Sequence, residues 1–208
     1  MPRVAVFIDW QNAYKSARAA FGLEDLPNER GNFSPYALSC ILAAGNGRGL
    51  GGAELVRVEI HRGIPSNRHD PTGYGANRKQ ASAWVRENQE IVKPCLRPLA
   101  YRDQWGRLPV EKGIDVQLAL AALENVLLRH CDTAIIFSHD TDLAPAVELI
   151  ARLRGPAAVE TVSWRSHNFK SRLRPVPGVH HHEISGLVFQ KVETPVNYAY
   201  KGPPLDSN

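Results

Sequence analysis

Four aspartates stand at points in the sequence where a fold often places reactive groups. Asp9 ends the apolar run RVAVFI, and Asp140 and Asp142 follow the apolar run TAIIF within the stretch SHDTDLAP. Asp115 lies at the start of the helical pattern IDVQLALAAL. Carboxylates that meet at one place repel strongly unless a cation neutralises them or some of them are protonated. Because hard oxygen ligands suit Mg²⁺ or Mn²⁺, the four aspartates predict a site for one of these ions.

A divalent ion held by carboxylates can orient a phosphate, activate a water for in-line attack and stabilise the leaving oxygen. Three neighbouring residues are candidates for substrate contacts: Asn12 through an amide oxygen or N–H, Lys112 through its charge, and Ser138 through its hydroxyl. Turns and helix caps use the same residue types. The alternatives of an N-cap for Asp9 and of plain surface or turn roles for Lys112 and Ser138 therefore stay open.

Short apolar runs rich in β-branched residues alternate with helical patterns along the chain. This alternation predicts an α/β sandwich with a mainly parallel central sheet. In such sheets ligands bind beyond the carboxyl ends of the strands, where the strand order reverses. If the first and fourth runs flank that point, Asp9 and Asp140 become neighbours. The expected strands are Arg3–Ile8, Leu55–Ile60, Ile91–Leu96, Thr133–Phe137 and Ala157–Val162.

The order of strands and helices is expected to bring the helix start at Asp115 to the same edge of the sheet. The segment that it begins has apolar residues on most of its faces, which predicts deep packing between the sheet and its neighbours. Gly45–Gly52 and Ser66–Gly75 are expected to be loops, and the second, which contains Tyr74, could close over a substrate. The expected helices are Asn12–Phe21, Ser34–Ala44 with Ser34 as N-cap, Asn77–Gln89, Ile114–Arg129 and Leu143–Leu153.

The composition is that of a soluble globular chain. Its 208 residues, 43% of them apolar, fit one domain over residues 1–193 followed by an irregular tail over 194–208. The formal charge of +4 is compatible with an anionic partner. Three cysteines without CxxC or CxxH spacing predict neither a disulfide framework nor a zinc site. Without a signal peptide or a long apolar segment, we expect a cytoplasmic protein with no membrane partner.

A basic segment near the C-terminus is the candidate RNA-binding surface. Between Arg152 and Arg174 the sequence has six basic residues and one acid, and Trp164 and Phe169 lie among the cations. This mixture suits phosphate contacts and base stacking on single-stranded RNA, although a solvated basic face over two core aromatics is equally compatible. The candidate substrate-binding cations are Arg165, Lys170 and Arg172.

The histidine run His180, His181 and His182 invites a metal interpretation. Adjacent residues of an extended chain point to alternate faces, however, so the three side chains cannot all bind one ion. A place in a turn or an edge strand is the favoured interpretation.

Three motifs resemble the NYN-domain family of PIN-like nucleases, which includes the LabA-type proteins. The motifs are VFIDWQN, EKGIDVQLALAAL and IIFSHDTDLAPAVELI, in the family's order. The resemblance implies a Rossmann-like three-layer α/β/α fold and metal-dependent ribonuclease activity. It places Asp9, Asp115, Asp140 and Asp142 at the positions of the family's acidic cluster and Asn12 at that of its asparagine. Two positions depart from the family's pattern: His139 replaces a usual Gly, and Leu143 replaces a usual aromatic residue.

The leading hypothesis is a Mg²⁺- or Mn²⁺-dependent endoribonuclease in which Asp9, Asp115, Asp140 and Asp142 are both catalytic residues and metal ligands. The expected partner is RNA in single-stranded or loop regions, and a homodimer or a regulatory protein partner stays open. A competing hypothesis is a non-catalytic RNA-binding or regulatory NYN module. A phosphatase or a phosphoacceptor domain is less well supported, because the DxDxT pattern of aspartyl nucleophiles is missing after Asp9.

Overall fold

The fold is built on a parallel sheet, seen in a computed structural model that describes residues 1–45, 52–102, 108–165, 173 and 176–200. The strands of this sheet are β1 (Arg3–Asp9), β2 (Glu54–Ile64), β3 (Val92–Pro98), β6 (Thr133–Phe137), β7 (Val159–Trp164) and β8 (His180–Ile184). Their order is β3-β2-β1-β6-β7-β8, and each neighbouring pair is parallel. Two short strands, β4 (Ala100–Tyr101) and β5 (Pro109–Val110), form a separate antiparallel pair.

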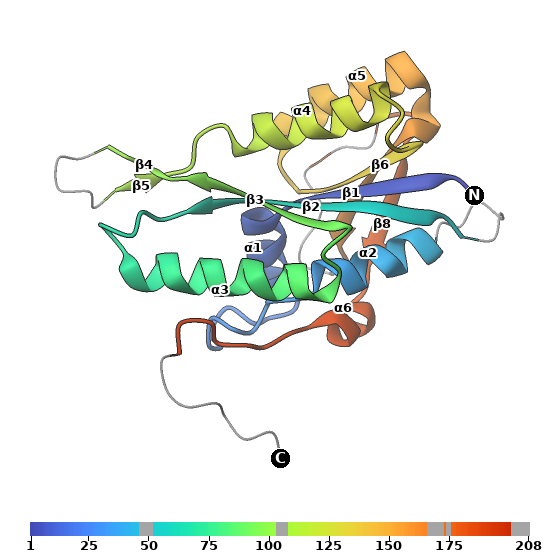
Figure 1. Cartoon of the computed structure of the whole chain (residues 1–208). Coiled ribbons are helices and arrows are strands. Elements are labelled where there is room, and N and C mark those ends of the chain that lie inside the picture. Colours follow the sequence, from blue (N-terminus) through green and yellow to red (C-terminus); the bar gives the residue numbers. More distant parts are fainter. Residues whose placement is uncertain (46–51, 103–107, 166–172, 174–175, 201–208) are drawn as a thin grey trace.

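Helices cover both faces of the sheet (Figure 1). One layer contains α4 (Ile114–Leu127) and α5 (Ala144–Arg154), which are drawn above the sheet in Figure 1. The opposite layer contains α1 (Trp10–Ala20), α2 (Pro35–Ala44), α3 (Pro71–Glu87) and α6 (Gly186–Val192). The 3₁₀ turns Thr141–Leu143 and Pro156–Ala158 precede α5 and β7. The predicted three-layer α/β/α architecture with a parallel sheet is therefore confirmed.

Alternate residues of β1 pack into two separate hydrophobic cores. Val4, Val6 and Ile8 pack in the cluster that contains residues of α1, α2 and α3, whereas Ala5 and Phe7 pack with residues of α4 and α5. All five side chains are fully buried. A strand covered on both faces needs such a continuous apolar run, which is why the run at the N-terminus predicts this central strand.

Trp164 belongs to the core and not to an RNA-binding surface. Its side chain is 1% exposed, and its Nε1–H donates to the backbone carbonyl of Ala13 at 2.8 Å. Base stacking requires an accessible ring face, so the predicted stacking role of Trp164 is wrong. Phe169, the second aromatic residue of that segment, lies outside the described residues.

Two helices differ from their predicted form. Helix α3 begins at Pro71, because the Asp70 carboxylate accepts from the Gly73 N–H at 2.8 Å and a proline at the first helical position favours initiation. Much of the loop predicted over Ser66–Gly75 is therefore helical, including Tyr74. Helix α4 is packed on one side only and not deeply, since Val116 and Leu120 are 61% and 60% exposed.

The C-terminal part contains β8 and α6, and of these the sequence patterns did not indicate α6. The histidine run lies on β8, the edge strand beside β7, in agreement with the favoured interpretation. His181 lies between the hydroxyls of Thr161 and Ser163 at 2.7 and 2.9 Å, while His182 Nε2 lies 2.7 Å from Glu160 Oε2. The two imidazoles thus contact different side chains of β7, as alternation along a strand requires.

The remaining predictions about the chain as a whole have mixed outcomes. A domain that ends at residue 193 stays a prediction; Thr194 N–H donates to Asn32 O at 2.9 Å, so the segment that follows is attached to the fold at its start. Residues 46–51, most of the predicted loop Gly45–Gly52, lie outside the described residues. Within the described ranges, no helix has the length and apolar character needed to cross a membrane.

Candidate metal centre

The candidate site lies where the strand order of the sheet reverses. Strands β1 and β6 are parallel neighbours, with Ile8 opposite Phe137, and the order runs outward from them in both directions. Because parallel strands end at the same edge, Asp9 and the segment that begins at Ser138 emerge side by side. The predicted neighbourhood of the first and fourth strand ends is confirmed.

Asp9 is the buried member of the site. This residue is only 6% exposed. Its Oδ1 accepts a hydrogen bond from the Asn12 N–H at 3.1 Å, and its Oδ2 accepts one from the Ser138 hydroxyl at 3.0 Å. The first bond makes Asp9 the N-cap of α1. The Asp9 carboxylate can therefore cap α1 and belong to the candidate site at the same time.

A short hydrogen-bonded turn fixes the acids that follow β6. The Ser138 hydroxyl accepts from the Asp140 N–H at 3.1 Å, and Asp140 Oδ1 accepts from the Asp142 N–H at 2.9 Å. The His139 N–H donates to Asn12 Oδ1 at 2.8 Å, which ties this turn to the first turn of α1. Asp140 is half-buried and Asp142 is exposed, so both lie at the mouth of the site rather than beneath it.

Asp115 reaches the site from the opposite side, in the first turn of α4. The chain enters this helix through Gly113, whose φ of 71° lies in the left-handed region that glycine adopts without strain. Burial raises the pKa of Asp115, and the negative charges of Asp140 and Asp142 raise it further. Asp115 is therefore near enough to the acids after β6 for their charges to act on its carboxyl group.

The electrostatics of the site favour a bound cation. Burial raises the pKa of Asp9 from 3.8 to about 7, although the hydrogen bonds from Asn12 and Ser138 act in the opposite direction. The charges of Asp115 and Glu111 also raise the pKa of Asp9. A cation at this place would relieve the repulsion, and the oxygen-only donor set matches the preference of Mg²⁺ or Mn²⁺. The chemistry of the donor set therefore suits such an ion, although the carboxylate oxygens of these aspartates are not gathered as closely as the side chains of Glu59, His61 and Cys95.

Glu111 and Lys15 are two charged residues of the site for which the sequence predicted no role. Burial and the charge of Asp115 raise the pKa of Glu111, while Lys15 and a hydrogen bond from the Gly63 N–H lower it. Gly63 permits this bond because a Cβ there would lie 2.6 Å from Glu111 Oε1. The position of Lys15 three residues after Asn12, on the same helical face, is a local signal that could have indicated its role.

The predicted substrate-binding residues have unequal positions. Lys112 is exposed beside the start of α4, and Arg165 is exposed directly after β7, at the same edge of the sheet. Ser138 is fully buried and its hydroxyl is engaged by Asp9 and Asp140, so it positions these acids and is not an exposed donor for substrate. Lys170 and Arg172 lie outside the described residues.

His139 and Leu143 depart from the expected motif in different ways. Leu143 is fully buried in the core beside α4 and α5, where its apolar side chain contributes packing. His139 is 4% exposed, and burial together with His181 lowers its pKa to about 4. At neutral pH its imidazole is therefore neutral, and it adds no positive charge beside Asp140.

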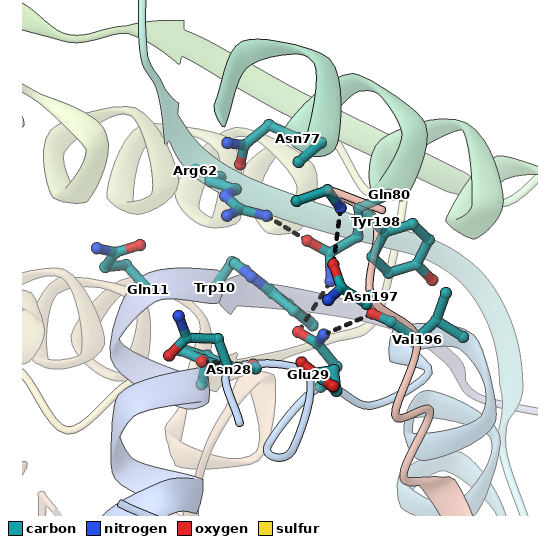
Figure 2. A pocket seen from close by; sticks show the side chains of 14 residues that line it. Trp10, Gln11, Asn28, Glu29, Arg62, Asn77, Gln80, Val196, Asn197 and Tyr198 are labelled. Carbon is teal, nitrogen blue, oxygen red and sulfur yellow. Dashed lines mark hydrogen bonds between the residues drawn. The ribbon is translucent and has the colours of Figure 1, made fainter. Parts of the chain in front are cut away.

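A polar pocket of about 480 Å³ lies between α1, α3 and the segment over residues 196–199 (Figure 2). Figure 2 shows Arg62 hydrogen-bonded to Gln80, which in turn bonds Asn32 at 3.0 Å. Gln11, Arg62 and Asn77 line this pocket and also an adjoining hollow that is lined by Lys15 and Glu111. The polar pocket thus continues toward the carboxylates.

The loop that walls this pocket is held in place by a buried cation. The Arg18 guanidinium donates to the backbone carbonyls of Glu24, Leu26, Pro27 and Arg30 at 2.6–2.8 Å. One side chain of α1 therefore fixes the segment that carries Asn28 and Asn32 to the pocket.

Comparisons with known proteins agree with this architecture. The family model described as NYN domain matches residues 3–176. A crystal structure of a protein of unknown function from Vibrio parahaemolyticus is similar with a TM-score of 0.55 and 20% sequence identity, over 89% of this chain and 93% of that one. At that identity the likeness shows the fold alone. No curated protein matches the chain significantly.

Proposed function

The chain belongs to the NYN-domain family, within the PIN-like superfamily, and from this premise we propose that it is a metal-dependent endoribonuclease. NYN domains are related to nucleic acids, and the family is generally nuclease-like. The observation that carries the proposal is that β1 and β6 end side by side at the reversal point of the sheet, where the Ser138 hydroxyl joins Asp9 to the Asp140 backbone. A cation would relieve the repulsion among these acids, and a cation at this edge suits chemistry on a phosphodiester.

The proposed metal ligands are the four aspartates, with Asp9 beneath and Asp115, Asp140 and Asp142 around the opening. Mg²⁺ or Mn²⁺ held by these residues would polarise a phosphate oxygen and lower the pKa of a water for in-line attack. Asp9 has to lose its proton to take part, since its pKa without an ion is about 7. Ser138 and Asn12 hold this carboxylate in place through the bonds at 3.0 and 3.1 Å.

The charge distribution around the acids supports an RNA substrate. Lys15, Lys112 and Arg165 are exposed near the same edge and can offset phosphate charge on either side of a scissile bond. The polar pocket is lined by Gln11 and Asn77, whose amide groups are of the kind that read base edges in unpaired RNA. We therefore propose single-stranded or loop regions of RNA as the substrate.

Cleavage of labelled single-stranded RNA, structured RNA and single-stranded DNA tests this proposal. The reactions contain Mn²⁺, Mg²⁺ or EDTA and compare the wild-type protein with Asp140→Asn. Asp132→Asn is the matched control, because Asp132 precedes the amino end of the same strand, β6, and pairs with Arg3 at 3.3 Å on the opposite edge of the sheet. We expect metal-dependent cleavage of unpaired RNA by the wild type and the control, and a loss of at least about 100-fold in Asp140→Asn.

Two outcomes would contradict the proposal. Cleavage that persists in EDTA or in Asp140→Asn would exclude the acidic cluster as the catalytic site. Binding of RNA without cleavage under any metal would instead favour a non-catalytic RNA-binding or regulatory NYN module.

A further inference from the structure

A second cluster of possible metal ligands lies on the sheet face that carries α4. Glu59 and His61 are alternate residues of β2 and so share a face, and Cys95 on β3 is the direct partner of His61. One ligand atom from each of the three residues lies within 4.8 Å of the other two. On its other side His61 is paired with Asp9 of β1, so this cluster is in the strand next to the acidic site but shares no residue with it.

Two distances within the cluster match edges of a tetrahedral zinc site. His61 Nε2 lies 3.2 Å from Glu59 Oε2, and Cys95 Sγ lies 3.7 Å from the same oxygen. Tetrahedral coordination with Zn–N and Zn–O bonds of about 2.0 Å separates nitrogen from oxygen by about 3.3 Å. With a Zn–S bond of about 2.3 Å, sulfur and oxygen are about 3.5 Å apart. Both separations agree with those found to about 0.2 Å.

The surroundings of the cluster orient its carboxylate and leave its imidazole incompletely bonded. The Arg57 Nε–H donates to Glu59 Oε1, which leaves Oε2 directed at His61 and Cys95. Partners of this kind hold the ligating carboxylates of metal sites. His61 is 1% exposed, and its Nδ1 is buried without a hydrogen-bond partner among the described residues. Hydrogen bonds of the described residues therefore satisfy Glu59 fully and His61 only in part.

An ion can reach the cluster from solvent. Glu59 lines an open groove between the sheet and α4, together with Arg97, Gly113 and Gln117. This groove can supply a water as the fourth ligand of a tetrahedral ion, since three protein ligands and one water make a common zinc site.

We propose that Glu59, His61 and Cys95 bind one Zn²⁺ ion that joins β2 to the edge strand β3. Thiolate and imidazole ligands select a borderline-soft transition metal over Mg²⁺, so this site and the acidic site discriminate between metals. The dication binds the thiolate and the thiol proton passes to solvent, so charge and atoms balance. The ion would stabilise the edge strand that leads through β4 and β5 to Glu111 and α4.

Titration of the EDTA-treated full-length protein with Co²⁺, followed by absorption spectroscopy, tests this site. Co²⁺ replaces Zn²⁺ and reports a bound thiolate as a charge-transfer band in the near ultraviolet. We expect this band to saturate at one equivalent and to disappear when Zn²⁺ is added. The band should be absent in Cys95→Ser and much weaker in Glu59→Gln. The control Cys40→Ser, which removes a half-buried thiol on α2, should retain it.

The experiment separates this site from the acidic one. Asp140→Asn should retain the thiolate band, because the acidic cluster binds through oxygen alone. The absence of a thiolate band in the wild-type protein would overturn the proposal, as would a band that survives in Cys95→Ser. Neither result depends on whether the protein cleaves RNA.

Discussion

Replacing Asp9 with asparagine is expected to stabilise the metal-free protein at neutral and alkaline pH. The structure raises the pKa of this carboxyl from 3.8 to about 7, chiefly through burial. Ionised Asp9 therefore opposes folding. Asparagine is isosteric and neutral, its Oδ1 can still accept from the Asn12 N–H, and its amide can donate to the Ser138 hydroxyl, so the substitution removes the charge and keeps the contacts.

The expected effect depends on pH in a defined direction. A group with a raised pKa in the folded state contributes stability that is complete below its unfolded value, 3.8, and is lost as pH rises through about 7. At about 1.36 kcal/mol for each tenfold change in proton affinity, this loss amounts to about 4 kcal/mol near pH 8 and to less than about 1 kcal/mol near pH 4. The stabilisation of the protein by Asp9→Asn should therefore be larger at pH 8 than at pH 4, by the difference between these two losses.

Urea unfolding in EDTA at pH 4 and pH 8 measures this effect. Asp132→Asn is the control, because hydrogen bonds from Arg3 lower the pKa of Asp132 and its titration lies below 3.8. This substitution at an exposed residue should lower the free energy of unfolding only slightly, and by nearly the same amount at pH 4 and pH 8. An equal free-energy change for Asp9→Asn at both pH values, or a loss of stability at pH 8, would refute the argument that Asp9 is a strained, buried acid.

Three further results follow from the geometry of the site. Mg²⁺ at 100 times its dissociation constant should stabilise the wild-type protein by about 2.7 kcal/mol in urea unfolding, and Asp140→Asn should show much less; equal stabilisation would place the ion elsewhere. Ser138→Ala removes a hydrogen bond that lowers the pKa of Asp9, so the acidic limb of the pH–rate profile should move to higher pH. Gly63→Ala should displace Glu111, whose charge raises the pKa of Asp9, and move that limb to lower pH; shifts in the same direction for both variants would contradict these assignments.

The principal acids could be predicted from the sequence because their positions follow from local patterns. The apolar runs before Asp9 and Asp140 are strands with both faces covered, and parallel strands end at one edge. Once β1 and β6 are neighbours, the acids that follow them meet without any further information. The start of α4 could be predicted for a similar reason, because its apolar pattern begins beside Asp115.

Other parts of the site depend on contacts that no local pattern encodes. Glu111 reaches Gly63 across 48 positions of sequence, and the approach is possible only because residue 63 has no side chain. Cys95 meets His61 through the register of β2 and β3, which the spacing rules for zinc motifs do not consider. The cysteine spacing therefore predicted no zinc site, although the fold brings three suitable ligands together.

The surface role of the aromatic residues also depended on tertiary structure. Trp164 follows a strand pattern and precedes a basic segment, and both a core and a stacking role agree with that sequence. Its indole lies between Phe33, Phe137 and Phe189 at centroid distances of 4.8–5.4 Å, so packing decides in favour of the core. The polar pocket beside α1, in contrast, is formed by residues from separate elements, so no single stretch of sequence could indicate it.

The central claim, that the four aspartates form a site for Mg²⁺ or Mn²⁺, is tested most directly by X-ray diffraction from crystals grown with Mn²⁺. The anomalous signal of Mn²⁺ marks its position independently of any assay. We expect an anomalous peak surrounded by Asp9, Asp115, Asp140 and Asp142, and the loss of that peak in crystals of Asp140→Asn. A peak at Glu59, His61 and Cys95 alone, or no peak among the four aspartates at saturating Mn²⁺, would contradict it.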